Sequence, residues 1–222
     1  MNSQKSYQTQ SLKDVAVDYL TQKIMTGEYK PNEKINEVQI SKELGISRAP
    51  IREGIKELSS QGLVNQIPRK GTYVVELTEK DVKEIYEIRI SIENSIIEKV
   101  ITENRLKNKD FACLKQKIKL MEKIANSKAD FNTKKIKINR EDIKFHKYIW
   151  EKADSPRRLE ILFDLHRQLQ MAMLFDTEMT GDLKNTAETH HAIVKYLKAG
   201  DIQKTQAALV DHIEMYNLEN QN

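Results

Sequence analysis

The stretch that most constrains the fold of this chain covers residues 45–53, which read as a tight turn followed by the first turns of a helix. Arg48 and Arg52 stand four positions apart, so a helix with 3.6 residues per turn places both on one face. A second, apolar face is formed by Ile51, Ile55 and Leu58. A helix that is basic on one side and anchored by the other is the form in which side chains are presented to the major groove. The stretch therefore indicates a DNA-reading helix.

Composition and charge agree with this interpretation. The 222 residues are 39% hydrophobic and 32% charged, with seven glycines and four prolines, and the apolar spacing is helical over most of the length. We expect one or two soluble domains and a mostly α protein. The net charge is +4, and residues 1–75 alone contain 11 Lys+Arg against 8 Asp+Glu. Most of the positive excess thus lies in the N-terminal third, which suits an anionic partner there.

Several classes of protein are excluded. The single cysteine, Cys113, rules out an intramolecular disulfide and fits a reducing compartment. No apolar run approaches the ~20 residues of a membrane span. Residues 1–10 are polar and do not resemble a signal peptide. We expect a cytoplasmic protein with no membrane contact.

The N-terminal part predicts three helices. Residues 1–10 are expected to be a flexible arm and 11–76 a domain. The helices are predicted over residues 12–25, 38–44 and 48–61, with caps at Ser11, Asn36 and Ser47 and a turn at Gly45.

A hairpin follows the third helix. Residues 63–67 and 72–75 read as two strands joined by a turn over 68–71. Three helices followed by a small hairpin form a winged helix-turn-helix. Arg69 and Lys70 at the wing tip are placed to approach phosphates or a minor groove, and Gly71 would let the backbone come close.

Residues 12–75 resemble the DNA-binding domain of GntR-type transcriptional regulators. The resemblance rests on the run over residues 40–53, on Leu58, on residues 62–64 and on the wing over 69–72. In that family the residues matching Arg48 and Arg52 contact operator DNA, and the wing glycine approaches it. Gly54 departs from the family pattern, which more often has alanine, and a glycine inside a helix costs about 0.5–1 kcal/mol.

Nine residues are the candidate DNA contacts: Ser47, Arg48, Ala49, Arg52, Lys56, Arg69, Lys70, Gly71 and Thr72. The alternative for each charged member is an ordinary solvated side chain. If they bind DNA, phosphate contacts should dominate the affinity and arginine-to-guanine pairs the selectivity.

The second half reads as helical throughout. Residues 77–80 form a predicted hinge, and 81–218 an all-helical domain whose first helix starts at Glu79 behind a Thr78 cap and ends near Glu103. Further helices are predicted over 110–126, 134–153, 156–178, 183–199 and 201–218. We expect an antiparallel all-α bundle of six or seven helices.

Four polar residues in this half could converge. Asp142 and His146 are four apart and share one face. His190 lies 10 residues before Gly200 and His212 lies 12 after it. In an antiparallel helical hairpin their heights would agree to within ~3 Å. Three imidazoles and one carboxylate form a good divalent-metal set with one or two positions left open.

Other interpretations of these histidines stay open. Each could be a satisfied core or surface residue, and His191 could replace His190 if the helix phase differs. His166 has no partner at metal spacing and is interpreted as structural.

Arg89 falls within an apolar stripe, where an unpaired charge would be costly. It could form an internal salt bridge to Glu93 or Asp142. It could instead clamp an anionic effector beside a metal.

The second half resembles the FCD domain, the effector-binding half of the FadR subfamily of GntR regulators. The resemblance rests on residues 77–89, 142–146, 189–201 and 211–213. In many members the four positions matching Asp142, His146, His190 and His212 bind a divalent metal. That metal is often zinc, nickel or manganese, and it binds the carboxylate of a small organic acid. The position matching Arg89 is often assigned to the effector.

The combined hypothesis is a homodimeric, metal-containing repressor that binds double-stranded operator DNA at an inverted repeat and responds to a small organic acid. Zinc is the first choice of metal, with nickel and manganese as alternatives. Two rivals remain: a metal-dependent enzyme and a purely structural metal site.

Overall fold

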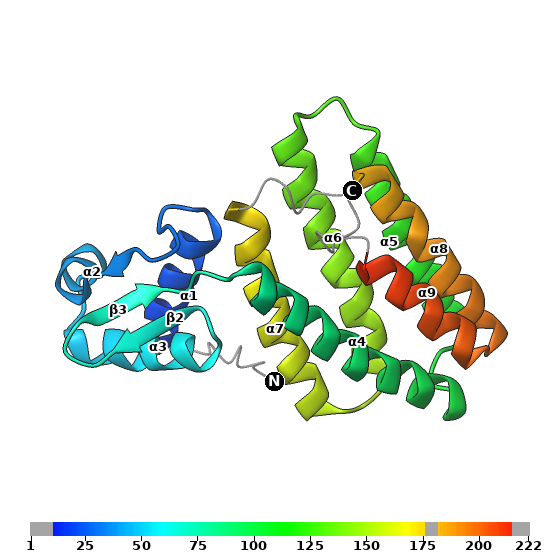
Figure 1. Ribbon diagram of the computed structural model, residues 1–222, viewed down its shortest axis with the longest axis horizontal. Helices are drawn as coiled ribbons and strands as arrows, with labels where there is room; N and C mark the ends of the chain where they lie inside the picture. The colour runs from blue at the N-terminus through cyan, green and yellow to red at the C-terminus, as the bar shows by residue number, and fades with distance from the viewer. Residues whose placement is uncertain (1–10, 176–181, 215–222) are drawn as a thin grey trace, which may run out of the picture. The chain divides into compact units, whose positions relative to one another are not determined.

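The computed structural model describes residues 11–175 and 182–214, and it divides between Glu76 and Leu77 into two compact units (Figure 1). Each unit has its own core, and each is described separately below. The expected arm over residues 1–10 lies outside the described residues.

The first unit is a winged helix-turn-helix, as the sequence predicts. Its helices are α1 (Leu12–Met25), α2 (Glu37–Leu44) and α3 (Arg48–Ser60), and its strands are β1 (Lys34–Ile35), β2 (Val64–Ile67) and β3 (Gly71–Val74). The strands form an antiparallel sheet in the order β1-β3-β2. The core comprises side chains from all three helices and from the start of the wing, among them Leu20, Ile40, Ile55 and Leu63.

Strand β1 is absent from the sequence prediction, which has only a two-stranded hairpin. It pairs Lys34 with Tyr73 and Ile35 with Thr72. Two residues are too short to show the alternation by which strands are recognised, so only the pairing with β3 reveals this one. The third strand joins the segment before α2 to the wing.

Local capping follows the sequence except at Ser47. The Ser11 hydroxyl accepts from the backbone of Asp14 in a capping box, and the Asn36 side chain caps α2. Gly45 has φ +65°, the left-handed conformation expected of the turn. Ser47 occupies the N-cap position of α3 but makes no side-chain capping bond, so its predicted capping role is wrong. The Ser47 side chain is exposed.

Gly54 has a packing reason. A Cβ atom at this position would lie 3.3 Å from Ala16 Cβ and 3.3 Å from the backbone nitrogen of Val17. Helix α3 therefore crosses α1 closely at the point where its side chain is missing. The loss of helix propensity at Gly54 accompanies this close approach of the two helices.

The second unit is an all-helical bundle, as predicted, with six helices in its described part: α4 (Glu79–Thr102), α5 (Asn108–Ala125), α6 (Phe131–Lys152), α7 (Pro156–Phe175), α8 (Leu183–Ala199) and α9 (Ile202–Glu214). Thr78 caps α4 in a capping box with Asp81. The last residues of the helices predicted over 156–178 and 201–218 lie outside the described residues.

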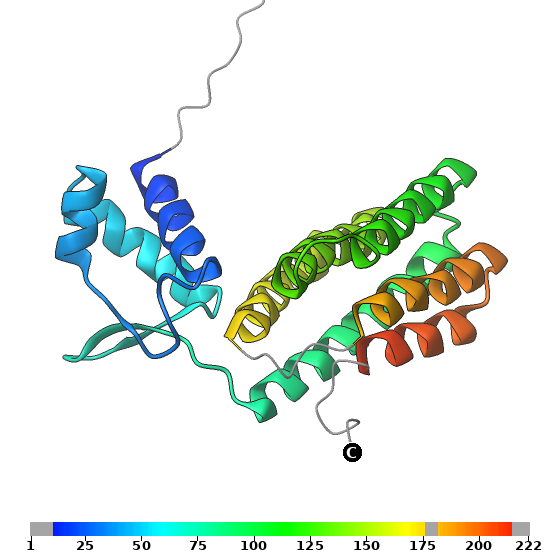
Figure 2. The same cartoon turned by 90° about the horizontal axis from the view of Figure 1, so that it is seen from above.

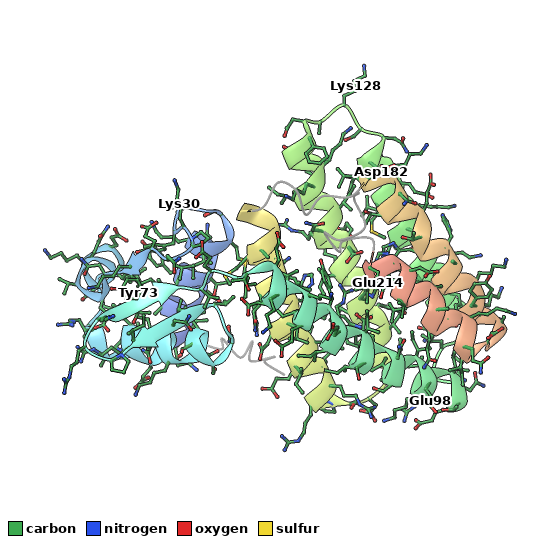
Figure 3. All side chains as sticks on the ribbon, in the orientation of Figure 1. Lys30, Tyr73, Glu98, Lys128, Asp182 and Glu214 are labelled. Carbon is green, nitrogen blue, oxygen red and sulfur yellow. The ribbon has the colours of Figure 1, made fainter. Side chains whose placement is uncertain are left out.

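Helices α8 and α9 form the antiparallel hairpin on which the metal hypothesis depends. They turn at Gly200, which has φ +72°, and they lie side by side in both views (Figures 1 and 2). Asp182, the N-cap of α8, and Glu214, the last residue of α9, mark the two open ends of this hairpin (Figure 3). Both helices pack on other members of the bundle, α8 on α5 and α9 on α4.

None of the helices within residues 11–175 and 182–214 is both long enough and apolar enough to cross a membrane.

Candidate DNA-binding face and candidate metal centre

Arg48 and Arg52, two of the candidate DNA contacts, share one partner. Arg48 and Arg52 project from α3 with side chains that are 50% and 57% exposed. Arg48 Nη2 donates to Glu37 Oε2 at 3.0 Å, and Arg52 Nε donates to the same oxygen at 2.9 Å. A single carboxylate from the first turn of α2 therefore holds both cations. The sequence interpretation missed Glu37, because its contact with α3 depends on the turn between the two helices.

Burial alone would raise the pKa of the Glu37 carboxyl, but the Arg52 and Arg48 guanidinium groups lower it below its usual value. Glu37 is thus an anion at neutral pH. The carboxylate occupies the place on both arginines that a DNA phosphate or a guanine edge would take.

A groove surrounds this contact. It is lined by the start of α2, the start of α3, strand β1 and the beginning of β3, and its charged members are Lys34, Glu37, Arg48 and Arg52. Val38, also in the lining, is 45% exposed. The groove thus brings the recognition helix, the wing base and the unpredicted strand to one surface.

Most of the predicted DNA contacts are exposed. Ala49 and Lys56 are exposed on α3, and Arg69 and Lys70 are exposed at the turn between β2 and β3. Arg69 has φ +63°, an unusual conformation for a residue with a side chain. Tyr73, labelled on the sheet in Figure 3, donates its hydroxyl to the Lys70 carbonyl and so supports the wing turn.

Two wing residues differ from the simple picture of a contact surface. Gly71 has φ +117°, and a Cβ atom there would lie 2.9 Å from Lys34 Cε, so the glycine also makes room for that lysine. Thr72 is only 6% exposed because it sits in the central strand, opposite Ile35 and Gln66. Burial separates Thr72 from the exposed members of the predicted set.

In the second unit, the structure brings Asp142, His146, His190 and His212 together. One potential ligand atom from each residue lies within 4.8 Å of the others, and all four side chains are buried. Asp142 and His146 come from α6, His190 from α8 and His212 from α9. The alternative with His191 fails, because that side chain is exposed and pairs with Glu122 at 2.7 Å.

The separations fit a metal ion. Asp142 Oδ1 lies 3.1 Å from His190 Nε2, 3.4 Å from His212 Nε2 and 3.9 Å from His146 Nε2. Ligands at ~2.1 Å around a tetrahedral ion are about 3.4 Å from one another. The observed spacings lie around this value.

The hydrogen bonds of the outer ring nitrogens favour ligation. His146 Nδ1 is 2.9 Å from the Glu93 carboxylate, and His190 Nδ1 is 2.8 Å from the Thr186 carbonyl. Both partners only accept, so both Nδ1 atoms bear the proton. His212 Nδ1 is 2.9 Å from the Thr189 hydroxyl, which in turn donates to the Thr186 carbonyl. In its neutral form, each of the three rings therefore presents an Nε2 lone pair.

These lone pairs face one another. His146 Nε2 lies 3.1 Å from His212 Nε2, and neither His190 Nε2 nor Asp142 Oδ1 has a hydrogen-bond partner among the described residues. Four acceptors gathered in a buried space repel each other unless a cation lies between them. The donor set, three imidazoles and one carboxylate, suits a divalent transition metal.

Burial and charge keep the cluster in the binding form. Burial alone would raise the pKa of Asp142, but the imidazoles, His146 foremost, hold it well below its ordinary value. Burial, with the neighbouring His190, lowers the pKa of His212 to about 3. At neutral pH, Asp142 is thus ionised and His212 neutral, which are the states that ligate metals.

Arg89 and Glu93 form a buried pair on α4. Arg89 Nε donates to Glu93 Oε1 at 2.6 Å, and the two side chains are 5% and 4% exposed. This is the internal salt bridge that the sequence left open, with Glu93 rather than Asp142 as the bonded partner. The Nη2 atom of Arg89 is buried and has no hydrogen-bond partner among the described residues.

Another residue joins this region, although the sequence assigned it a structural role. His166 on α7 is 8% exposed, and its Nε2 atom has no hydrogen-bond partner among the described residues. Burial and the positive charge of Arg89 lower its pKa to about 3. The Asp142 carboxylate acts on this pKa in the opposite direction, so His166 lies near the cluster without belonging to it.

Comparison with known families gives the identity of both units. Residues 12–74 match the family described as "Bacterial regulatory proteins, gntR family", and residues 84–215 match the FCD domain. The chain belongs to the GntR family of transcriptional regulators. Its FCD domain is that of the FadR-type subfamily, so the protein is a DNA-binding transcriptional regulator of the GntR/FCD type.

Named relatives agree. The chain is 31% identical over 198 residues to an uncharacterized HTH-type transcriptional regulator, YdhC, of Bacillus subtilis, covering 87% of this chain and 82% of that protein. It is 26% identical to a probable D-xylose utilization operon transcriptional repressor of Paenarthrobacter nicotinovorans, covering 90% and 84%. The fold is also that of E. coli McbR/YncC, with a TM-score of 0.74, 22% identity and coverage of 95% and 99%.

Proposed function

We propose that this GntR-family regulator is a homodimeric repressor whose helical domain holds a divalent metal and binds a small carboxylate effector. The observation that supports it most is the set of four buried acceptors from Asp142, His146, His190 and His212, whose ligand atoms all lie within 4.8 Å of one another. Zinc suits this donor set best, and nickel or manganese would also fit. Bound there, the ion would act as a Lewis acid with a position open to an oxygen ligand.

The charge balance supports an anionic effector. Without metal, the charged side chains linked to the cluster by printed contacts are one cation, Arg89, and two anions, Glu93 and Asp142. A divalent ion changes the net charge of this group from −1 to +1. One bound carboxylate would then neutralise it, with the Nη2 atom of Arg89, which has no hydrogen-bond partner among the described residues, as a donor. A neutral ligand would leave an uncompensated buried charge.

On the DNA side, we propose Arg48 and Arg52 for the major groove and Arg69 and Lys70 for the wing contact. Each chain offers one recognition helix, so a homodimer would bind two half-sites related as an inverted repeat. The relative named as a probable D-xylose utilization operon repressor supports negative control here.

The proposed response depends on α4. This helix supplies Arg89 and Glu93 and begins at Glu79, three residues after the division between the two units. An effector that binds one arrangement of α4 better than another would shift the population of DNA-binding dimers. Reciprocally, operator DNA would weaken effector binding.

The metal claim is tested by elemental analysis of the purified protein and by Zn²⁺ titration of the metal-stripped protein. His190→Ala should lower the Zn²⁺ affinity at least tenfold. His191→Ala is the matched control, because the adjacent ring is exposed, and it should leave the affinity unchanged. Equal affinities of the two variants would exclude the proposed site.

The rivals give different results in the same experiment. If His190→Ala and His212→Ala abolish folding rather than effector response, the metal is structural. If metal-loaded protein turns over small organic acids, the site is an enzyme. A thermal-shift screen of such acids with and without Zn²⁺ should instead show stabilisation that requires the metal.

The DNA claim is tested with duplexes selected from a random-sequence pool. Arg52→Ala should weaken binding to the selected sequence by about 1–3 kcal/mol and relax selectivity at one position of each half-site. Arg105→Ala, an exposed arginine of the helical unit, is the control and should bind normally. Unchanged affinity and selectivity in Arg52→Ala would contradict the proposal that Arg52 contacts the major groove.

A further inference from the structure

Glu93 lies between Arg89, the proposed effector-binding residue, and His146, a proposed metal ligand. Its Oε1 atom accepts from Arg89 Nε at 2.6 Å, and its Oε2 atom accepts from His146 Nδ1 at 2.9 Å. All three side chains are buried, with residue exposures of 4%, 3% and 1% for Arg89, Glu93 and His146. Each carboxylate oxygen thus serves a different partner.

The outer ring nitrogen of His146 has a charged partner, the Glu93 carboxylate. The outer nitrogens of His190 and His212 contact a backbone carbonyl and a hydroxyl, Thr186 O and Thr189 Oγ1. A carboxylate acceptor raises the basicity of the opposite ring nitrogen more than a neutral acceptor does. The ligand strength of His146 therefore depends on a charged partner, and that partner also binds Arg89.

We propose that Glu93 is a positioning residue that couples Arg89 to the metal-binding nitrogen of His146, so that an anion on Arg89 tightens metal binding. The inference rests on the proposed function, since it takes the cluster as a metal site and Arg89 as the anion clamp. No direct contact of Glu93 with the metal or the effector is involved.

The direction follows from the shared charge. An anion bound to Arg89 Nη2 partly neutralises the guanidinium charge, so Arg89 polarises the Glu93 carboxylate less. The Glu93 carboxylate then accepts more strongly from His146 Nδ1–H, and His146 Nε2 becomes a better ligand. By linkage, bound metal must strengthen anion binding at Arg89 by the same factor.

The metal alone can test this through a double-mutant cycle. Zn²⁺ affinity is measured by competition with a chromophoric chelator for the wild type, Arg89→Met, Glu93→Gln and the double variant. Arg89→Met removes the guanidinium charge and should tighten Zn²⁺ binding several-fold. Glu93→Gln should weaken it about 10–100-fold.

Glutamine is the informative replacement because both partners of Glu93 donate. A carboxamide has one acceptor oxygen and an NH₂ group that only donates. Glu93→Gln therefore cannot accept from Arg89 and from His146 with separate oxygens. Adding Arg89→Met to Glu93→Gln should therefore change the Zn²⁺ affinity by no more than about twofold. The coupling between Arg89 and Glu93 is the difference between the effect of Arg89→Met in the wild type and its effect in Glu93→Gln. Equal factors in both backgrounds would show that Arg89 acts on the metal through space, and would overturn the proposal.

Thr189→Val is the matched control. It removes the acceptor of another ligand, His212 Nδ1, with little change of shape and without touching Arg89. It should weaken Zn²⁺ binding but retain the several-fold effect of Arg89→Met. If that effect also disappears in Thr189→Val, the cycle reports general softening of the site and the role of Glu93 is rejected.

A spectroscopic measurement tests the same coupling without the Glu93 variants, so it does not depend on whether those variants fold. In metal-free wild type and Arg89→Met, ¹⁵N shifts of the His146 ring should show the proton on Nδ1, with a shifted Nε2 resonance in the variant. A changed Zn²⁺ affinity with an unshifted His146 resonance would contradict the relay. Absence of Zn²⁺ binding by the wild type would instead refute the proposed metal function itself, so the two failures are distinguishable.

Discussion

Each unit of this protein uses one glutamate to hold two basic groups, but the surroundings differ. On the candidate DNA-binding face, Glu37 holds Arg48 and Arg52 through one oxygen, and both arginines are at least half exposed. In the helical bundle, Glu93 holds Arg89 and His146 through separate oxygens, and all three side chains are almost fully buried. The first arrangement can open to water or DNA, whereas the second is enclosed by the bundle.

The difference teaches what each arrangement can do. An exposed ion pair contributes little to stability because water and salt compete with it, so it can be exchanged for DNA at small cost. A buried pair stabilises the fold only while both members are present, because loss of one member leaves the other charge unpaired in a medium of low dielectric constant. We therefore expect Glu37 to affect binding more than folding, and Glu93 to affect both.

The largest expected effect is that of Glu93→Ala. It leaves the Arg89 guanidinium buried without its carboxylate, and we expect a loss of about 3–5 kcal/mol in the free energy of unfolding. Urea denaturation monitored by circular dichroism measures it. Glu98→Ala, at an exposed position of the same helix, is the control and should change stability by less than about 0.5 kcal/mol. A loss below about 1 kcal/mol in Glu93→Ala would show that burial does not make Glu93 more important for stability than Glu37.

An intermediate effect is expected at Asp110, whose carboxylate is buried but whose ion-pair partner, Lys152, is 30% exposed. Asp110 also accepts from the Tyr148 hydroxyl and from the backbone of Lys107. We expect Asp110→Asn to lower the free energy of unfolding by about 1–3 kcal/mol. A loss as large as that in Glu93→Ala would mean that a partly exposed ion-pair partner stabilises the fold as much as a buried one.

The pH dependence at Asp110 gives a second measurement. Burial opposes its ionisation, but Lys152 and Tyr148 lower its pKa to about 2 in the folded state, below the ordinary value of 3.8. The unfolded chain thus takes up this proton first, so the contribution of Asp110 is complete above pH 3.8 and is lost as the pH falls towards 2. The stability difference between wild type and Asp110→Asn should shrink over this window in acid titrations. A difference that stays constant would contradict the assignment.

The smallest effect on stability is expected for Glu37→Gln, below about 1 kcal/mol, because both arginines remain solvated. Its effect on DNA should be clearer: without the competing carboxylate, binding to unrelated DNA should strengthen and the ratio of specific to non-specific affinity should fall. Titrations of selected and scrambled duplexes at two salt concentrations measure both. An unchanged ratio would show that Glu37 does not restrain the arginines.

Much of the fold could be predicted from local patterns. The helix predicted over residues 12–25 matches α1, and those predicted at residues 79 and 183 begin where α4 and α8 begin, because caps such as Ser11 and Thr78 act within four residues. Local patterns did not predict strand β1, which is defined only by its pairing with β3. They also failed at Ser47, where sequence type alone does not ensure that a hydroxyl makes the capping bond.

The candidate sites divide in the same way. Helical spacing was enough to align Asp142 with His146, and the turn at Gly200 was enough to place His190 level with His212. Spacing does not reveal partners on other helices, so the hydrogen bonds of Glu93 to His146 and of Thr189 to His212 were not predicted. The same holds for His166, which the sequence assigned a structural role and which lies close to the charge of Arg89.

The sequence by itself determined the elements, their faces and the two families, since periodicity, caps and motifs are properties of neighbouring residues. Tertiary structure alone decided which acid holds which base. Glu37 is bonded to Arg48 and Arg52 because the α2–α3 turn brings it there, and Glu93 to His146 because α4 packs on α6. Hydrogen bonds form over about 3 Å, whereas these residues lie 11 to 53 positions apart in the chain. Only the packing of the helices could specify them.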